Sequence, residues 1–254
     1  MDGVFFWAMA GLAAALVGAG KGGIPVVGML GVPVLSLAIS PITAAGLLLP
    51  VYVLSDMFAL YAYRASFNGR VLAILAVGVT IGVGIGWATA SVTPEWAVTG
   101  LVGAIGFAFA LTMLLAKTEK PARPADVARG VFWGALTGFT SFVSHSGAPP
   151  YQVYVQPLRL EKLVFAGTGT MLFAYLNAIK LIPYAALGQF SPANLKVAVM
   201  LMPVAALSVW GGVRLVKHLP ERVFFQIITW ALLAISIKLI WDGARGGLLG
   251  AGVV

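Results

Sequence analysis

Cysteine is absent from this chain of 254 residues, and charged residues make up only 9% of it. The missing thiols exclude disulfide bonds and thiolate metal sites, and we expect neither a metal nor another cofactor. Soluble domains contain roughly 25% charged residues, whereas here apolar side chains account for 60% of the chain. The composition therefore predicts an integral membrane protein.

Four apolar runs have nearly the length of a helix that crosses the hydrocarbon core of a bilayer, which is about 20 residues. Runs of this length predict helices rather than a barrel of strands, so the expected fold class is an all-α polytopic membrane protein. The four runs are residues 71–90, 97–116, 195–213 and 223–241.

The net charge of +8 would suggest nucleic acid as the partner of a soluble protein. In this chain the basic residues lie in short loops between the apolar runs, where their first role is to orient the chain in the membrane. We therefore expect the lipid bilayer as a partner and no nucleic acid.

The chain reads as an internal duplication. A shift of about 125 residues pairs Pro25 with Pro150 and brings Gly86 close to Gly212, and self-similarity of this kind indicates a repeat architecture. The expected parts are a first transmembrane repeat at 1–118, a cytoplasmic linker at 119–129 and a second transmembrane repeat at 130–254.

The charges of the loops predict that the two repeats are inverted. Positive charge in short loops marks the cytoplasmic side, which places the basic loops at 64–70, 117–129, 159–162 and 214–222 in the cytoplasm. The loop around Glu95 falls on the other side, although its repeat equivalent, around Glu221, lies in the cytoplasm. Inversion requires an odd number of segments, and we count about five helical segments in each repeat. The alternative is two parallel four-helix halves with Lys21 in an ordinary loop.

Glycine- and proline-rich breaks occupy equivalent places in the two halves, at residues 18–25 and 144–150. In lipid, an interrupted helix persists only where protein buries it or where it lines a wet cavity. The apolar pieces after the breaks, at about 24–39 and 151–158, are too short to cross a hydrocarbon core of about 30 Å. We therefore expect broken or re-entrant helices that meet near the midplane, as in transporters built from inverted repeats.

The breaks predict a binding site for an anion. Free amides at a helix start carry partial positive charge, and Lys21 adds a full one. A cation site would instead require carboxylates, and Asp56 is the one acid well inside a predicted span. Asp56 either pairs with a buried base or caps a kink, and the sequence does not decide between these roles, so we leave it out of the site. The predicted substrate-binding residues are Lys21, Gly22, Gly23, Thr43, Ser144, His145, Ser146, Gly147, Gln152, Thr168 and Asn177.

Several of these residues have alternative structural roles. Lys21 could extend to the membrane interface, as long basic side chains often do. His145 is either a donor to a nearby carbonyl or a proton-coupling group. The hydroxyls of Thr43 and Thr168 face the site or bond back to their own helices. Lys180 acts together with Asn177, three residues before it, or anchors the outer end of its helix.

Small residues recur at four-residue spacing in the run 78–86. In lipid, such spacing allows two helices to approach closely. The sequence leaves open whether the run packs within one chain or in a homodimer.

The strings GKGGIP at 20–25, SFVSHSGAPP at 141–150, FAGT at 165–168 and NAIKLIPY at 177–184 resemble the sulfite exporter TauE/SafE family of membrane permeases. The resemblance covers essentially the whole chain, and the second-half strings are its more specific part. It implies transport of small sulfur-containing or organic anions, such as sulfite or sulfonates, across the inner membrane of a bacterium. The chain departs from the commoner glycine-rich string of the family at Lys21.

The interpretation favoured by the sequence is a secondary transporter with alternating access around an anion site. No P-loop string is present, so we do not expect ATP hydrolysis by this chain. An anion channel of the same architecture is the main alternative. An enzyme is not expected, because Ser144 or Ser146 beside His145 is the one candidate pairing, and neighbours in sequence do not make a triad.

The absence of native thiols allows a direct test of the inverted orientation with single cysteines. We expect Ser66→Cys and His218→Cys to react with a membrane-impermeant thiol reagent from the cytoplasmic side, and Thr93→Cys from the opposite side. Labelling of Thr93→Cys and His218→Cys from the same side would contradict the inversion, since these positions lie in equivalent loops of the two repeats.

Overall fold

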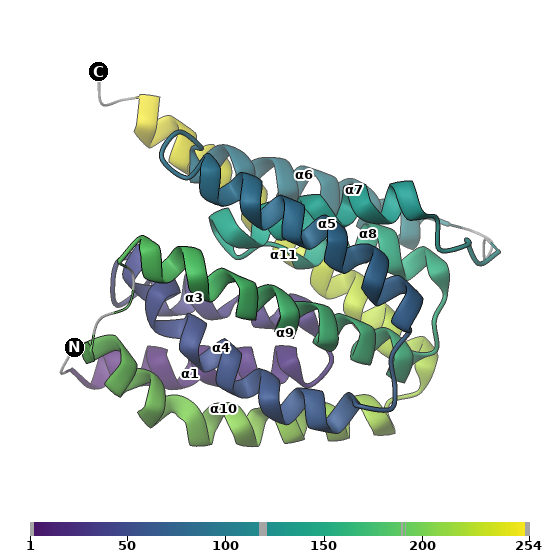
Figure 1. Cartoon of the computed structure of the whole chain (residues 1–254), viewed down its shortest axis with the longest axis horizontal. Coiled ribbons are helices and arrows are strands. Elements are labelled where there is room, and N and C mark those ends of the chain that lie inside the picture. Colours follow the sequence, from purple (N-terminus) through teal and green to yellow (C-terminus); the bar gives the residue numbers. More distant parts are fainter. Residues whose placement is uncertain (1–2, 117–120, 189, 191, 252–254) are drawn as a thin grey trace. The chain divides into compact units, whose positions relative to one another are not determined.

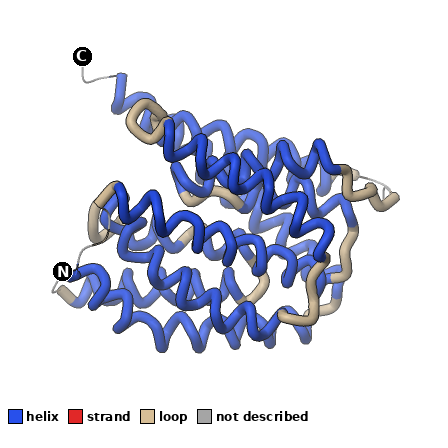
Figure 2. The backbone as a smooth tube through the Cα atoms, viewed as in Figure 1, coloured by secondary structure: helices blue, strands red, loops and turns tan. Residues whose placement is uncertain are grey.

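The computed structural model of the protein describes residues 3–116, 121–188, 190 and 192–251. These residues form helices and loops, and no strand occurs among them (Figure 2). Seven helices of the described chain are long and apolar enough to cross a membrane, which confirms the predicted all-α polytopic fold. They are α1 (Val4–Lys21), α4 (Pro41–Tyr63), α5 (Gly69–Ala88), α6 (Glu95–Leu114), α9 (Lys162–Ala186), α10 (Pro192–His218) and α11 (Glu221–Ala251).

The other helices surround the two breaks. The first break is followed by α2 (Pro25–Gly28) and α3 (Gly31–Leu35), and the second by α8 (Ala148–Val155) and the 3₁₀ helix η1 (Gln156–Leu158). Short helices after each break are what the sequence predicted. α7 (Val127–Ser144) precedes the second break and starts within the segment expected as a linker. It starts there because the Asp126 carboxylate accepts a hydrogen bond from the Arg129 amide at 2.8 Å, which caps the helix.

The described chain divides into two compact units, and each unit draws on both halves of the sequence. The first unit is Met1–Asn68 with Lys162–Pro220, and it contains α1 to α4, α9 and α10. The second unit is Gly69–Glu161 with Glu221–Val254, and it contains α5 to α8, η1 and α11 (Figure 1). The proposed boundaries and inversion of the repeats remain predictions.

In the first unit, α1 and α4 both pack against α10, and α4 also packs against α9. Leu47, Leu48 and Val51 of α4 are fully buried in its core. Backbones touch where α1 ends, since a Cβ on Gly22 would lie 2.6 Å from the Cα atom of Gly212 in α10. Glycine at both positions therefore allows the end of α1 to lie directly on α10.

In the second unit, α5 packs along α7, α6 packs along α11, and α8 packs against α6 and α7. The glycine-rich run of α5 forms the contact with α7. A Cβ on Gly78 would lie 2.3 Å from the Val131 carbonyl oxygen, and one on Gly82 would lie 1.9 Å from the Ala135 carbonyl oxygen. Of the two arrangements that the sequence left open, packing within one chain is thus observed.

Large apolar side chains remain exposed on the long helices. Leu101, Ile182 and Leu207 are each more than half exposed. Such surfaces are unfavourable in water but suit the hydrocarbon core of a bilayer. Burial and composition therefore agree that this is a multi-pass membrane protein.

The contact between α5 and α7 predicts opposite effects for two neighbouring glycine substitutions. Gly82→Ala forces α5 away from the α7 backbone and should reduce the free energy of unfolding by about 1–3 kcal/mol. Gly84→Ala is the matched control, because nothing lies within 4 Å of its added Cβ and alanine favours a helix over glycine by up to about 1 kcal/mol. Thermal unfolding in detergent should give a lower Tm for Gly82→Ala alone, and equal Tm values for the two variants would contradict this packing.

Candidate functional site

The first break interrupts the helix at the predicted place. α1 ends at Lys21 and α2 begins at Pro25. Between them Gly23 has φ of 120°, a conformation that glycine adopts readily and other residues do not. A Cβ at Gly23 would also lie 2.5 Å from the Tyr63 hydroxyl oxygen. Both the backbone angle and the neighbouring side chain therefore favour glycine here.

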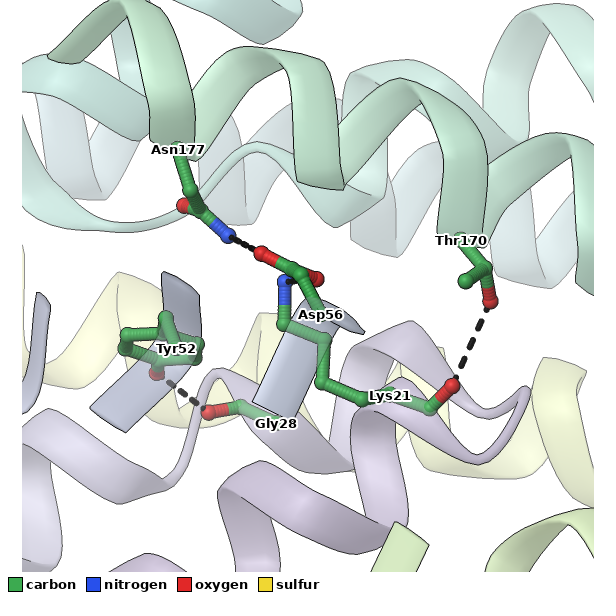
Figure 3. Close-up of polar contacts among 6 residues, drawn as sticks. All are labelled: Lys21, Gly28, Tyr52, Asp56, Thr170 and Asn177. Atoms are coloured by element: carbon green, nitrogen blue, oxygen red, sulfur yellow. Dashed lines mark hydrogen bonds and ion pairs between the residues drawn. The ribbon is translucent and has the colours of Figure 1, made fainter. Parts of the chain in front are cut away.

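Side-chain hydroxyls bind the backbone carbonyls around the first break. Tyr63 donates to the Gly22 carbonyl at 2.6 Å, and Tyr52, also on α4, donates to the Gly28 carbonyl at 2.8 Å (Figure 3). Thr170 of α9 donates to the Lys21 carbonyl at 3.3 Å. A lipid environment requires such internal partners for irregular backbone, so α4 and α9 stabilise the interruption.

The centre of the candidate site is an ion pair between Lys21 and Asp56. The distance between Lys21 Nζ and Asp56 Oδ1 is 2.6 Å, and the two side chains are 8% and 4% exposed. Asn177 Nδ2 donates to the other carboxylate oxygen, Oδ2, at 2.8 Å (Figure 3). α1, α4 and α9 thus each contribute one polar side chain to a single buried contact.

Asp56, which sequence reasoning left out of the site, is the partner of Lys21. The sequence contains a usable signal, because an acid and a base inside apolar segments are expected to pair with each other. The structure also contradicts the alternative role of Lys21 as a residue reaching the interface, since its ammonium group contacts Asp56 in the interior.

Lys180 of α9 adds a second buried positive charge to this region. Its side chain is completely buried, which contradicts the alternative of an anchor at the end of the helix. Lys180 Nζ lies 5.3 Å from the centre of the Tyr184 ring, and Lys21 Nζ lies 5.3 Å from the centre of the Tyr52 ring. Lys180 lies about one turn from Asn177 on α9, and Asn177 contacts Asp56. We call Lys21, Asp56, Asn177 and Lys180 the basic cluster.

The basic cluster contains more positive than negative charge. Among the described residues, the buried charged side chains are Lys21, Lys180 and Asp56. Two ammonium groups and one carboxylate leave one positive charge in excess when all three are ionised. Because charge in a low-dielectric interior is unfavourable unless it is compensated, this composition favours an incoming anion over a cation.

The second break is also observed, and backbone hydrogen bonds close the helix before it. α7 ends at Ser144, and His145 has φ of 53°, which is uncommon for a residue other than glycine. The amides of His145 and Ser146 donate to the carbonyls of Ser141 and Thr140, each at 3.2 Å. Such a left-handed residue with these bonds is a common way to end a helix.

The first turn of α8 provides few amide donors. Its second and third residues are Pro149 and Pro150, which carry no N–H group. The backbone amide of Tyr151 already donates to the Gly147 carbonyl at 3.3 Å. Side chains are therefore better suited than this helix start to hold an anion.

The predicted serines of the second break donate to nearby carbonyls. The Ser144 hydroxyl donates to the Thr140 carbonyl at 3.2 Å, and the Ser146 hydroxyl donates to the Ser144 carbonyl at 3.0 Å. These bonds support the helix end, and a role for the serines, His145 or Gly147 in substrate binding stays a prediction.

The predicted threonines also have structural partners. Thr168 Oγ1 donates to the Val164 carbonyl at 2.6 Å and accepts a bond from the Asn68 amide at 2.9 Å. Thr43 Oγ1 lies 2.7 Å from Ser40 Oγ at the start of α4. Both hydroxyls thus form hydrogen bonds within the protein, as the alternative of a structural role predicts.

Gln152 is the predicted residue of the second unit with the most unusual environment. Its side chain is completely buried, and neither amide atom has a hydrogen-bond partner among the described residues. Four residues later, at the start of η1, Gln156 Nε2 donates to Thr229 Oγ1 of α11 at 2.8 Å. A buried amide without partners costs about 1–3 kcal/mol, so Gln152 remains a strong candidate to contact a ligand.

The predicted site residues therefore fall into two groups. Lys21, Gly22, Gly23 and Asn177 lie in the first unit around the ion pair. Thr43 in the first turn of α4 and Thr168 in the second turn of α9 belong to the same unit. The predicted residues of the second break, from Ser144 to Gln152, belong to the second unit. That the two breaks meet remains a prediction.

Interrupted helices and buried charge inside an all-helical, membrane-spanning chain define the class of polytopic membrane transporters. Comparison with known proteins identifies the family. The family described as Sulfite exporter TauE/SafE matches residues 4–239, and the chain belongs to this family. Neither the curated proteins nor the solved structures compared with the chain gave a match.

Family membership confirms the resemblance seen in the sequence. TauE/SafE is a family of transporters, and the chain is accordingly a membrane permease or exporter of sulfur compounds. The seven apolar helices make it a multi-pass membrane protein.

Proposed function

We propose that this protein is a secondary transporter that carries small sulfur-containing or organic anions, such as sulfite or sulfonates, across the bacterial inner membrane. The observation that carries the proposal is the basic cluster, in which two buried lysines accompany one buried carboxylate beside a break in α1. Transport then occurs by alternating access around this site.

The donors of the basic cluster suit an anion with several oxygen atoms. Each lysine ammonium has three N–H donors, and the Asn177 amide has two. A sulfite or sulfonate group presents three oxygens around one sulfur atom. In a low-dielectric interior, the attraction between such a group and Lys21 is much stronger than in water. The cluster thus combines positive charge with several hydrogen-bond donors.

The second unit provides further predicted contacts. The Gln152 amide has donors that are not used by the described protein groups, and a neutral donor of this kind can bind an anion without adding charge. His145, Gly147 and the two serines are the other proposed contacts from the second break.

An anion channel with the same residues is the alternative, and transport kinetics distinguish the two. In proteoliposomes, a transporter with alternating access shows saturable uptake, and unlabelled anion inside accelerates the entry of labelled anion. A channel shows conductance that does not saturate in this way and no such exchange.

Ligand-dependent stability tests the anion site directly. At a methanesulfonate concentration of about 100 times the Kd, the purified protein should be stabilised by about 2.7 kcal/mol, because the anion binds the folded protein alone. Chloride salts of different cations should all give one common Tm. Lys21→Ala should strongly reduce the stabilisation by methanesulfonate in thermal unfolding measurements.

The matched control is Lys238→Ala in α11. Lys238 forms an ion pair with Asp242, as Lys21 does with Asp56, but its side chain is 39% exposed. This variant should keep the full stabilisation by methanesulfonate. An unaffected Lys21→Ala variant, or equal stabilisation by cations, would refute the anion site at Lys21.

A further inference from the structure

We infer that Asp56 takes up a proton when Lys21 binds the substrate anion, so that the basic cluster couples anion transport to proton transport. The inference rests on the proposed function and adds the coupling ion to it. It starts from the observation that the positive group proposed to hold the anion already has a negative partner inside the protein.

The geometry makes Asp56 a competitor of the anion. Lys21 Nζ contacts Asp56 Oδ1 at 2.6 Å, at a distance typical of a charge-assisted hydrogen bond. An anion that binds Lys21 must displace this carboxylate or lie beside it. Displacement leaves a buried carboxylate oxygen without its ammonium partner, and a position beside the carboxylate brings two negative charges together at Lys21, where like charges repel strongly.

Protonation of Asp56 removes this conflict, because the carboxyl group becomes neutral. Before binding, Lys21 is positive and Asp56 is negative. After binding, Lys21 is positive, the anion is negative and Asp56 is a neutral carboxylic acid. One anion and one proton have entered together, and the net charge of the cluster is unchanged.

The hydrogen bond from Asn177 identifies the oxygen that receives the proton. Asn177 donates to Oδ2, and a carbonyl oxygen accepts this bond as a carboxylate oxygen does. The bond therefore survives protonation if the proton goes to Oδ1, the oxygen released by Lys21. Asn177 would hold the carboxyl group in place in both states.

The surroundings of Asp56 contain few other titratable groups. α1 contributes Lys21, α9 contributes Lys180 and Tyr184, and α4 itself contributes Tyr52. The buried face of α10 has no titratable side chain among its described residues, and neither does α3. Asp56 is the one buried acid of the described chain, which makes it the group able to exchange a negative charge for that of the substrate.

Equilibrium binding of methanesulfonate to the purified full-length protein tests the inference, because this sulfonate stays anionic from about pH 5 to about pH 9. If one proton binds with each anion, the Kd rises about tenfold per pH unit above the pKa of the coupled group. Asp56→Asn, which resembles the protonated carboxyl, should bind methanesulfonate with a Kd that does not change with pH. Asp242→Asn changes an exposed carboxylate in the same way and should retain the wild-type pH dependence.

Two further variants separate Asp56 from other titrating groups. Lys180→Met should keep the dependence on pH, because the proposal assigns the proton to Asp56. His145→Gln should keep it as well. Loss of the pH dependence in His145→Gln or Lys180→Met, with its retention in Asp56→Asn, would overturn the inference.

If Asp56→Asn does not fold, a measurement on the wild-type protein tests the inference instead. Addition of methanesulfonate in weakly buffered solution should cause uptake of about one proton per bound anion, followed with a pH indicator. Binding without proton uptake would overturn the coupling and leave the proposed function intact. Absence of methanesulfonate binding at every pH would instead refute the proposed function.

Discussion

A charge inside a membrane protein requires a partner, and this constraint organises the first unit of the structure. Lys21 ends α1 with a buried side chain, and Asp56 of α4 neutralises it at 2.6 Å. Asn177 of α9 binds the same carboxylate. Removal of one partner from such a buried pair typically costs about 3–5 kcal/mol. Together with Asn177, the pair therefore links α1, α4 and α9 at the point where α1 is interrupted.

The same helices also satisfy the backbone of the interruption. Tyr52 and Tyr63 lie on α4 with Asp56, and their hydroxyls bind carbonyls on the two sides of Gly23. One helix thus supplies the counter-ion of Lys21 and the donors for the broken backbone. In the proposed mechanism, this arrangement keeps the break in place while Lys21 changes its partner from Asp56 to a substrate anion.

The sequence predicted the features that depend on local composition. Apolar runs of membrane-spanning length indicated long helices, and the glycine- and proline-rich stretches at 18–25 and 144–150 indicated the two breaks. Family membership was also accessible, because its strings lie within short stretches of the chain. These features are determined by residues that are close together in sequence.

The features that the sequence did not predict depend on tertiary packing. Asp56 was left out because the sequence did not decide between pairing with a buried base and capping a kink, and its partners are 35 and 121 residues away. The burial of Lys180 was missed because a lysine near a helix end resembles an anchor. The composition of the two units was likewise not predicted, since it depends on the packing of α1 against α10 and of α5 against α7.

The central claim is that Lys21 exchanges Asp56 for the substrate anion, and a crystal structure with 2-bromoethanesulfonate tests it most directly. The anomalous signal of bromine locates the ligand independently of the protein. The account predicts a sulfonate oxygen within about 4 Å of Lys21 Nζ, with Asp56 no longer in contact with that nitrogen. A sulfonate bound elsewhere, with the Lys21–Asp56 pair intact, would contradict it.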